Sequence, residues 1–147
     1  GMWAARFLTP EFFDLIKRGP GNNVLFCSAF EENEELPVGM SMLLYKPDRL
    51  IGRYWGARRF VDNLHFNLCF YHPIEWAIAN GIHFFDPGIG AAHKVRRGFE
   101  SVTAHSLHMF FYLYIQKIFD LNIGKINEHT RQQIEALNGL LPLKRSG

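Results

Sequence analysis

The pattern of hydrophobic and polar positions in the first third of the chain predicts a short helix followed by three strands. Thr9 and the proline after it are typical of an N-cap and a first helical position, so a helix is expected over 10–18. Apolar runs separated by short polar turns predict strands over 23–30, 38–45 and 50–55. Strands joined by such turns pair as an antiparallel meander.

The middle of the chain changes to a helical period. Its apolar positions recur every three or four residues, which is typical of one helix face. These positions are Leu64, Leu68, Tyr71, Ile74 and Ile78. Pro73 argues against an unbroken helix, so the helix proper is expected to begin near it. Asn80 and Gly81 close the helix, and a short strand is expected over 82–85.

The last third predicts one strand and two helices. Alternation over 101–108 indicates a strand, and 109–121 is expected to be helical, although its aromatic content leaves the boundary between the two open. Gly124 is expected to reset the chain before a final amphipathic helix over 125–138. The positions expected to face inward on that helix are Ile126, Ile134 and Leu137.

These elements define an α+β fold. Three antiparallel strands, a crossover helix and a parallel fourth strand make a mixed sheet with helices on both faces. The chain has 147 residues and no repeat or linker, so a single domain is expected over 2–147. Gly1 has the character of a cleavage scar ahead of a native methionine and is left aside.

Cysteine usage and hydropathy point to a soluble cytoplasmic protein. Cys27 and Cys69 lie in apolar runs and follow no secretory signal, so we expect them to be reduced core residues. The most apolar run, over 109–115, is far shorter than the ~18 residues that a membrane span needs. No membrane span is therefore expected.

Charge and motif composition exclude several classes of function. The net charge of +2 is too small to indicate DNA binding, although basic residues cluster in two segments and an acidic turn covers 31–35. His105 and His108 would lie on opposite faces of a strand, and neither H-E-x-x-H nor C-x-x-C occurs, so no metal site is expected. The absence of a G-x-S-x-G motif argues against serine-hydrolase chemistry.

The end of the third predicted strand is the first candidate site. The segment GRYWG covers 52–56, and Gly56 permits close approach of a ligand to the backbone. Arg58 and Arg59 can each pair with phosphate oxygens. The alternative is a strand end followed by a solvated basic turn.

The segment DPGIGAAHKVRRGF, residues 86–99, is the second candidate site. Its glycines, Gly88 and Gly90, permit a tight turn but are weak evidence for a phosphate loop. Neutral His93 can act as a general base, and Lys94 or Arg97 can hold a carboxylate or phosphate. The alternative is that these charges only cover a turn.

Three segments in this order resemble the Fem-like family of peptidoglycan biosynthesis or recognition proteins. They are GRYWG (52–56), LHFNLCFYHPIEWAIANGI (64–82) and HKVRRGF (93–99), so the resemblance covers roughly 46–108. The predicted element order also resembles the GNAT acyltransferase fold. The family usually has carboxylates where this chain has Asn67 and Ala92. Family members are also typically longer, and the chain resembles their C-terminal half.

The resemblance implies an N-acyltransferase that moves an acyl group from acetyl-CoA or another acyl-CoA, or an aminoacyl group from aminoacyl-tRNA, to an amine. It implies direct attack by the amine, with backbone N–H groups polarising the carbonyl. The implied cofactor-binding residues are Arg53, Gly56, Ala57, Arg58 and Arg59. The implied substrate-binding residues are Tyr54, His65, Lys94 and Arg97.

The implied catalytic residues are His93 as base, Tyr71 as acid, and Glu75. Glu75 follows Tyr71 by four positions, and a carboxylate on that largely apolar face would need Arg53 or His93 as partner. For Tyr71 and Tyr54, a buried ring with a satisfied hydroxyl is the alternative.

Two functions without catalysis stay open. The missing carboxylates at Asn67 and Ala92 favour a non-catalytic GNAT-like module that binds a ligand or partner. In the third hypothesis the aromatic run over 109–115 covers the sheet edge of a second copy, which makes a homodimer.

Overall fold

The structure is a computed structural model that describes residues 8–19, 23–89 and 92–142. The chain divides into two compact units, Gly1–Gly88 and Ile89–Gly147, which are described separately below. The single domain over 2–147 stays a prediction.

The first unit begins with α1, Pro10–Arg18, which confirms the expected helix. Proline stands at the start, where its missing N–H costs no intrahelical hydrogen bond. Glu11 lies in the first turn and Lys17 in the last, so their charges complement the helix dipole.

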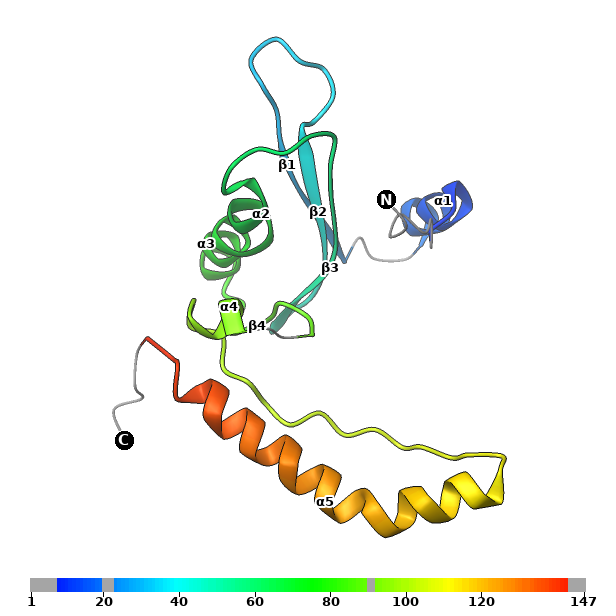
Figure 1. Ribbon diagram of the computed structural model, residues 1–147. Coiled ribbons are helices and arrows are strands. Elements are labelled where there is room, and N and C mark those ends of the chain that lie inside the picture. Colours follow the sequence, from blue (N-terminus) through cyan, green and yellow to red (C-terminus); the bar gives the residue numbers. More distant parts are fainter. Residues whose placement is uncertain (1–7, 20–22, 90–91, 143–147) are drawn as a thin grey trace. The chain divides into compact units, whose positions relative to one another are not determined.

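An open four-stranded mixed sheet forms the centre of the first unit (Figure 1). Strands β1 (Val24–Ala29), β2 (Gly39–Lys46) and β3 (Arg49–Ala57) pair antiparallel in sequence order, as expected for a meander. Strand β4 (Phe84–Asp86) pairs parallel with β3 at only three positions, Arg49–Ile51. The predicted α+β class and mixed sheet are therefore confirmed.

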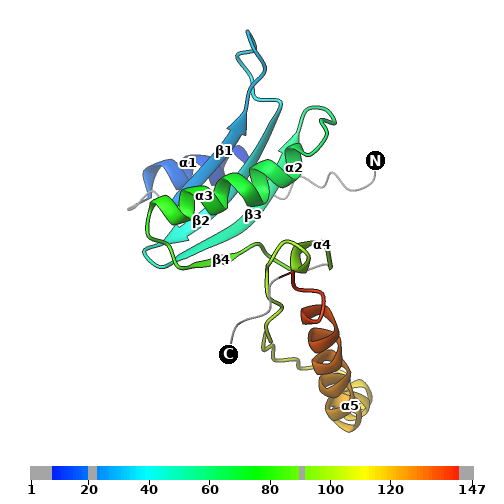
Figure 2. The same cartoon turned by 90° about the vertical axis from the view of Figure 1, so that its left-hand side faces the viewer.

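The crossover between β3 and β4 is one helical rod with a change of winding in its middle. It consists of α2 (Leu64–Phe66), the π-helix η1 (Asn67–Tyr71) and α3 (His72–Ala79). Figure 2 shows α2 and α3 lying across one face of the strands. The expectation that the helix proper begins near Pro73 is confirmed, because α3 starts at His72 with the proline in its first turn, although α2 and η1 add helical turns from Leu64 onward that were not expected.

The π-helical turn explains how the rod accommodates proline. The backbone N–H of His72 bonds to the carbonyl of Asn67, five residues back. The next donor in that pattern would be residue 73, but Pro73 has no N–H for the carbonyl of Leu68. The buried hydroxyl of Ser41 on β2 donates to this oxygen instead, at 2.5 Å. A strand side chain thus replaces the hydrogen bond that proline cannot make.

The hydrophobic core lies between the sheet and this crossover rod. Its fully buried members come from β1, β2, β3, η1 and α3: Cys27, Leu43, Leu50, Leu68 and Ala77. Both cysteines lie within the described residues and form no disulfide; Cys27 is buried, as expected, and Cys69 is half-buried. Burial raises the pKa of the Cys27 thiol, an effect that the neighbouring Ser41 hydroxyl partly offsets.

The second unit contains α4 (Ala92–Val95) and the long helix α5 (Leu113–Asn138). The predicted strand over 101–108 is wrong: this segment has no strand pairing in the described structure. It contacts α5 instead, where the His108 ring lies 5.5 Å from that of Phe119 and the side-chain amide of Asn138 bonds both the N–H and the carbonyl of Ser101.

The predicted break at Gly124 is also wrong, because α5 runs through this residue without interruption. One glycine inside a helix costs only about 1 kcal/mol relative to alanine, which a helix of this length can absorb. Ile126 is 45% exposed rather than inward, whereas Ile134 and Leu137 are half-buried. Within the described residues, no helix is long and apolar enough to cross a membrane.

Candidate functional site

The edge of β3 is open beyond its short pairing with β4. Among the described strands, none pairs with Gly52–Ala57 on the side of β3 that faces away from β2. At Gly52 an added Cβ would lie 3.4 Å from the carbonyl oxygen of Pro87, so the two segments are still close there. The chain then turns at Gly88, which has a φ of 82° and bonds the Asp86 carboxylate through its N–H at 2.8 Å.

A β-bulge interrupts the middle of β3 at Arg53. Met42 pairs with Tyr54 and Leu43 pairs with Gly52, so Arg53 is the extra residue that opposes no partner on β2. Its exposed guanidinium lies 5.0 Å from the centroid of the Tyr54 ring, within the range of a cation–π contact. Bulges often redirect side chains beside active sites, and this one lies on the open edge.

The end of β3 carries the predicted cofactor-binding residues Gly56, Ala57, Arg58 and Arg59. An added Cβ at Gly56 would meet no atom within 4 Å, so the backbone there is accessible. The two arginines, however, contact the acidic turn before β2. Arg58 pairs with Glu34 at 2.9 Å and donates to the Leu36 carbonyl at 3.3 Å, and Arg59 pairs with Glu31.

These ion pairs change what the arginines can do. Both guanidinium groups are about half exposed (54%), so each pair contributes roughly 0–1 kcal/mol to stability. An anionic ligand would have to compete with the two carboxylates. Because each ion pair contributes so little free energy, breaking it to bind the ligand costs little.

His65 lies in an aromatic cluster between α2 and β3. Its ring is edge-to-face with Trp55 at 5.3 Å and with Phe70 at 5.5 Å. Gly39 makes room for this cluster, since an added Cβ there would lie 2.8 Å from Leu64 Cδ2 and 2.9 Å from Trp55 Cη2. His65 is half-buried and is held by neighbouring rings.

Tyr71 and Glu75 are both exposed on the crossover rod. The expectation that Glu75 lies on a largely apolar face and needs a buried partner is wrong, because its side chain reaches solvent. Within the described residues, no ion pair joins Glu75 to Arg53. The alternative for Tyr71, a ring buried in the core with its hydroxyl satisfied, is likewise wrong, because this side chain is exposed.

The second candidate segment, residues 86–99, begins at the end of β4 in the first unit and contains the short helix α4 of the second unit. The guanidinium of Arg97 donates to the His93 carbonyl at 2.7 Å, and the Lys94 ammonium donates to the Ile89 carbonyl at 2.8 Å. The His93 side chain is exposed. Gly90 lies outside the described residues. The structure thus assigns His93, Lys94 and Arg97 to one unit and the other predicted site residues to the first.

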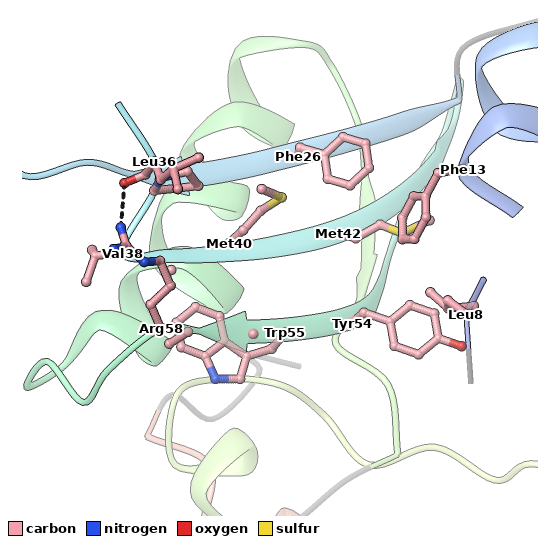
Figure 3. A pocket seen from close by; sticks show the side chains of 14 residues that line it. Leu8, Phe13, Phe26, Leu36, Val38, Met40, Met42, Tyr54, Trp55 and Arg58 are labelled. Carbon is pink, nitrogen blue, oxygen red and sulfur yellow. Dashed lines mark hydrogen bonds between the residues drawn. The ribbon is translucent and has the colours of Figure 1, made fainter. Parts of the chain in front are cut away.

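The sheet face opposite the crossover rod carries an apolar groove of about 420 Å³. Phe26, Met42 and Tyr54 are directly opposite one another on adjacent strands, so their side chains share this face. Figure 3 shows them pointing into the groove together with Met40, and Phe13 of α1 lies at its side. Among the described residues, no group of three or more His, Cys, Asp or Glu is arranged to hold a metal ion.

Sequence reasoning missed this groove, although β2 contains a signal for it. A strand covered on one face only should alternate apolar and polar residues, whereas Met40, Met42, Leu43 and Leu44 form a nearly continuous apolar run. Such a run indicates that both faces of the strand have apolar neighbours or ligands.

The fold and the open edge of β3 define an α+β protein with a mixed sheet and a candidate site at the end of its third strand. The FemAB-like family, described as peptidoglycan biosynthesis/recognition, matches residues 1–145, and the chain belongs to this family. The match confirms the Fem-like resemblance and extends it well beyond 46–108. No curated protein and no solved structure matches the chain.

Proposed function

We propose that this chain is an N-acyltransferase that moves an acyl or aminoacyl group onto an amine in peptidoglycan biosynthesis. Membership of the FemAB-like family supports the pathway. The observation that carries the proposal is the edge of β3, which pairs with β4 only at Arg49–Ile51 and has no partner from Gly52 to Ala57 among the strands that the structure describes. The strand order and the parallel β3–β4 pair support a GNAT-like fold.

In the proposed reaction the carbonyl of the donor lies along this open edge. Backbone N–H groups without a strand partner can donate to the carbonyl oxygen and stabilise the negative charge that develops there. The amine nitrogen attacks the carbonyl carbon, and the bond to the donor sulfur or ribose oxygen breaks. The roles implied by the family resemblance are His93 as the base that takes the proton from the amine and Tyr71 as the acid that protonates the leaving group.

The donor is an acyl-CoA such as acetyl-CoA, or an aminoacyl-tRNA. Arg53, Gly56 and Ala57 would contact it from β3. Tyr54, on the groove face of the sheet, and His65, on the face covered by α2, would each contact the acceptor from its own side of this edge. Glu75 would orient the acceptor amine. Because Arg58 and Arg59 contact Glu34 and Glu31, binding of a CoA diphosphate at this corner requires displacement of those carboxylates.

A non-catalytic recognition module is the second candidate. It is favoured by the same ion pairs, since the arginines already have anionic partners. In this case the open edge would bind a stem peptide without transferring a group to it.

The experiment is an amide-forming assay with the full chain, a peptidoglycan stem peptide that has a free lysine amine, and either acetyl-CoA or an aminoacyl-tRNA as donor. Mass spectrometry detects the new amide. His93→Ala should lower the rate by about 10²–10⁴-fold, whereas His129→Ala, an exposed histidine on α5, should leave it unchanged. If neither donor yields an amide while the peptide still binds, the transferase proposal fails and the recognition module holds.

A further inference from the structure

The apolar groove adjoins a second, polar cavity at the end of β3. This polar recess measures about 140 Å³ and is lined by Glu31, Glu34, Arg58 and Arg59 together with two apolar residues. The residues common to both cavities are Leu36, Val38 and Arg58. An apolar space of ligand size therefore leads directly to a pair of guanidinium groups.

The groove is suited to a hydrocarbon chain. Its volume is within the range of small-molecule sites, and it follows the chain from Val38, just before β2, to Met42, a length of about 13 Å at the rise of an antiparallel strand. Sugars and nucleotides need several polar partners, which this lining does not provide. Met40 and Met42 on the floor can adapt their rotamers to a chain of variable shape.

The polar recess is suited to an anionic head group. Arg58 and Arg59 already hold carboxylates there, namely those of Glu34 and Glu31. All four side chains are about half exposed, and both glutamates lie on the turn between β1 and β2. A ligand carboxylate or phosphate carries the same charge as the side chains that it would replace, so the exchange preserves the charge balance of the recess.

We propose that this face of the sheet binds a single-chain amphiphile, with its hydrocarbon tail in the apolar groove and its anionic head on Arg58 and Arg59. The groove lies on the face opposite the crossover rod, and the head site shares Arg58 and Arg59 with the proposed donor site; the proposal concerns binding and does not require acyl transfer. Glu31 and Glu34 act as internal substitutes for the head group when no ligand is bound.

The test is a calorimetric titration of the full chain with decyl phosphate and with decanoate, each below its micellar concentration. Decanol supplies the tail without the charge, and inorganic phosphate supplies the charge without the tail. We expect saturable binding of at least one anionic amphiphile, with decanol at least tenfold weaker and inorganic phosphate not detectable. The tighter of the two anions identifies the head group.

Variants separate the tail site from the head site. Met40→Gln places an amide on the groove floor and should weaken binding about tenfold, whereas Met109→Gln, at an exposed methionine of the second unit, should not. The double variant Glu31→Gln/Glu34→Gln removes the competing carboxylates and should tighten binding of the anionic amphiphile severalfold.

Three results would overturn the proposal. The first is the absence of saturable binding by either anion. The second is equal binding of decanol and decyl phosphate together with no effect of the double glutamine variant. The third is a concentration-dependent dimer in sedimentation that Met40→Gln dissociates, which would assign the groove to a second copy of the chain.

Discussion

The hydrogen bond between Ser41 and the π-helical turn can be tested by removing the hydroxyl. Ser41 is 2% exposed, and its Oγ donates to the carbonyl oxygen of Leu68 at 2.5 Å. Pro73 has no N–H to replace this donor. Ser41→Ala therefore leaves a buried carbonyl without a partner, at the point where the sheet meets the crossover rod.

An unsatisfied buried acceptor costs about 1–3 kcal/mol. At roughly 4 °C per kcal/mol for a unit of this size, Ser41→Ala should lower the thermal midpoint by about 4–12 °C. Urea unfolding followed by far-UV circular dichroism and tryptophan fluorescence measures the same loss. Ser106→Ala is the matched control, because Ser106 is exposed and its hydroxyl bonds only to its neighbour His108 among the described contacts. It should change stability by less than about 0.5 kcal/mol.

A double-mutant cycle tests whether the Leu68 carbonyl needs the Ser41 hydroxyl because Pro73 has no N–H. Pro73→Ala restores a backbone N–H in position to bond Leu68, so the cost of Ser41→Ala should be smaller in that background by about 1 kcal/mol. Additive effects of the two substitutions, or a cost for Ser41→Ala no larger than that of Ser106→Ala, would refute the reasoning.

Two further predictions concern glycines and the buried thiol. Gly124→Ala should stabilise α5 by about 1 kcal/mol because an added Cβ meets no atom within 4 Å, whereas Gly39→Ala should destabilise the first unit by about 1–3 kcal/mol through contact with Leu64 and Trp55. Urea unfolding should show opposite signs, and equal signs would contradict this account. Burial raises the pKa of Cys27 above its ordinary value of 9.0, so its contribution is complete below that pH and is lost as the pH rises through the folded-state pKa. Between pH 8 and 10.5 the wild type should therefore lose more stability than Cys27→Ala, and parallel curves would contradict the shift.

The first unit was largely predictable because its signals are local. Apolar runs bounded by short polar turns located β1, β2 and β3 to within a few residues, and the pattern of Asn80-Gly81 located the end of α3. The start of α3 beside Pro73 was predictable, whereas the π-helical turn before it was not, since the carbonyl of Leu68 in that turn is bonded by Ser41, which is 27 positions away in the sequence. Local rules cannot predict that a distant side chain will bond the carbonyl that proline, without an N–H, leaves unbonded.

The second unit shows where alternation misleads. Residues 101–108 have a strand-like pattern but no neighbouring strand, so the segment extends along α5 without a ladder. Gly124 does not interrupt α5, because one glycine costs less than a long helix gains from its other residues.

The sequence predicted which charged residues lie near the candidate site, but not which of them form ion pairs with one another. The acidic turn over 31–35 and the arginines at the end of β3 were both evident in the sequence. That Arg58 would contact Glu34 depends on the antiparallel register, which places the turn before β2 beside the end of β3. The bulge at Arg53 likewise follows from the register of two strands, and a single sequence does not report it.

The four strands lie in the sheet in the same order as in the chain, and this has a consequence for folding kinetics. Each antiparallel pair closes a short loop, so β1, β2 and β3 can form early from contacts of low sequence separation. Only β4 must wait, because its three parallel pairs form after the whole crossover rod has wound. On a chain that emerges from the ribosome N-terminus first, the meander leaves before β4 does, so we expect the β3–β4 pairs to be the last part of the sheet to form.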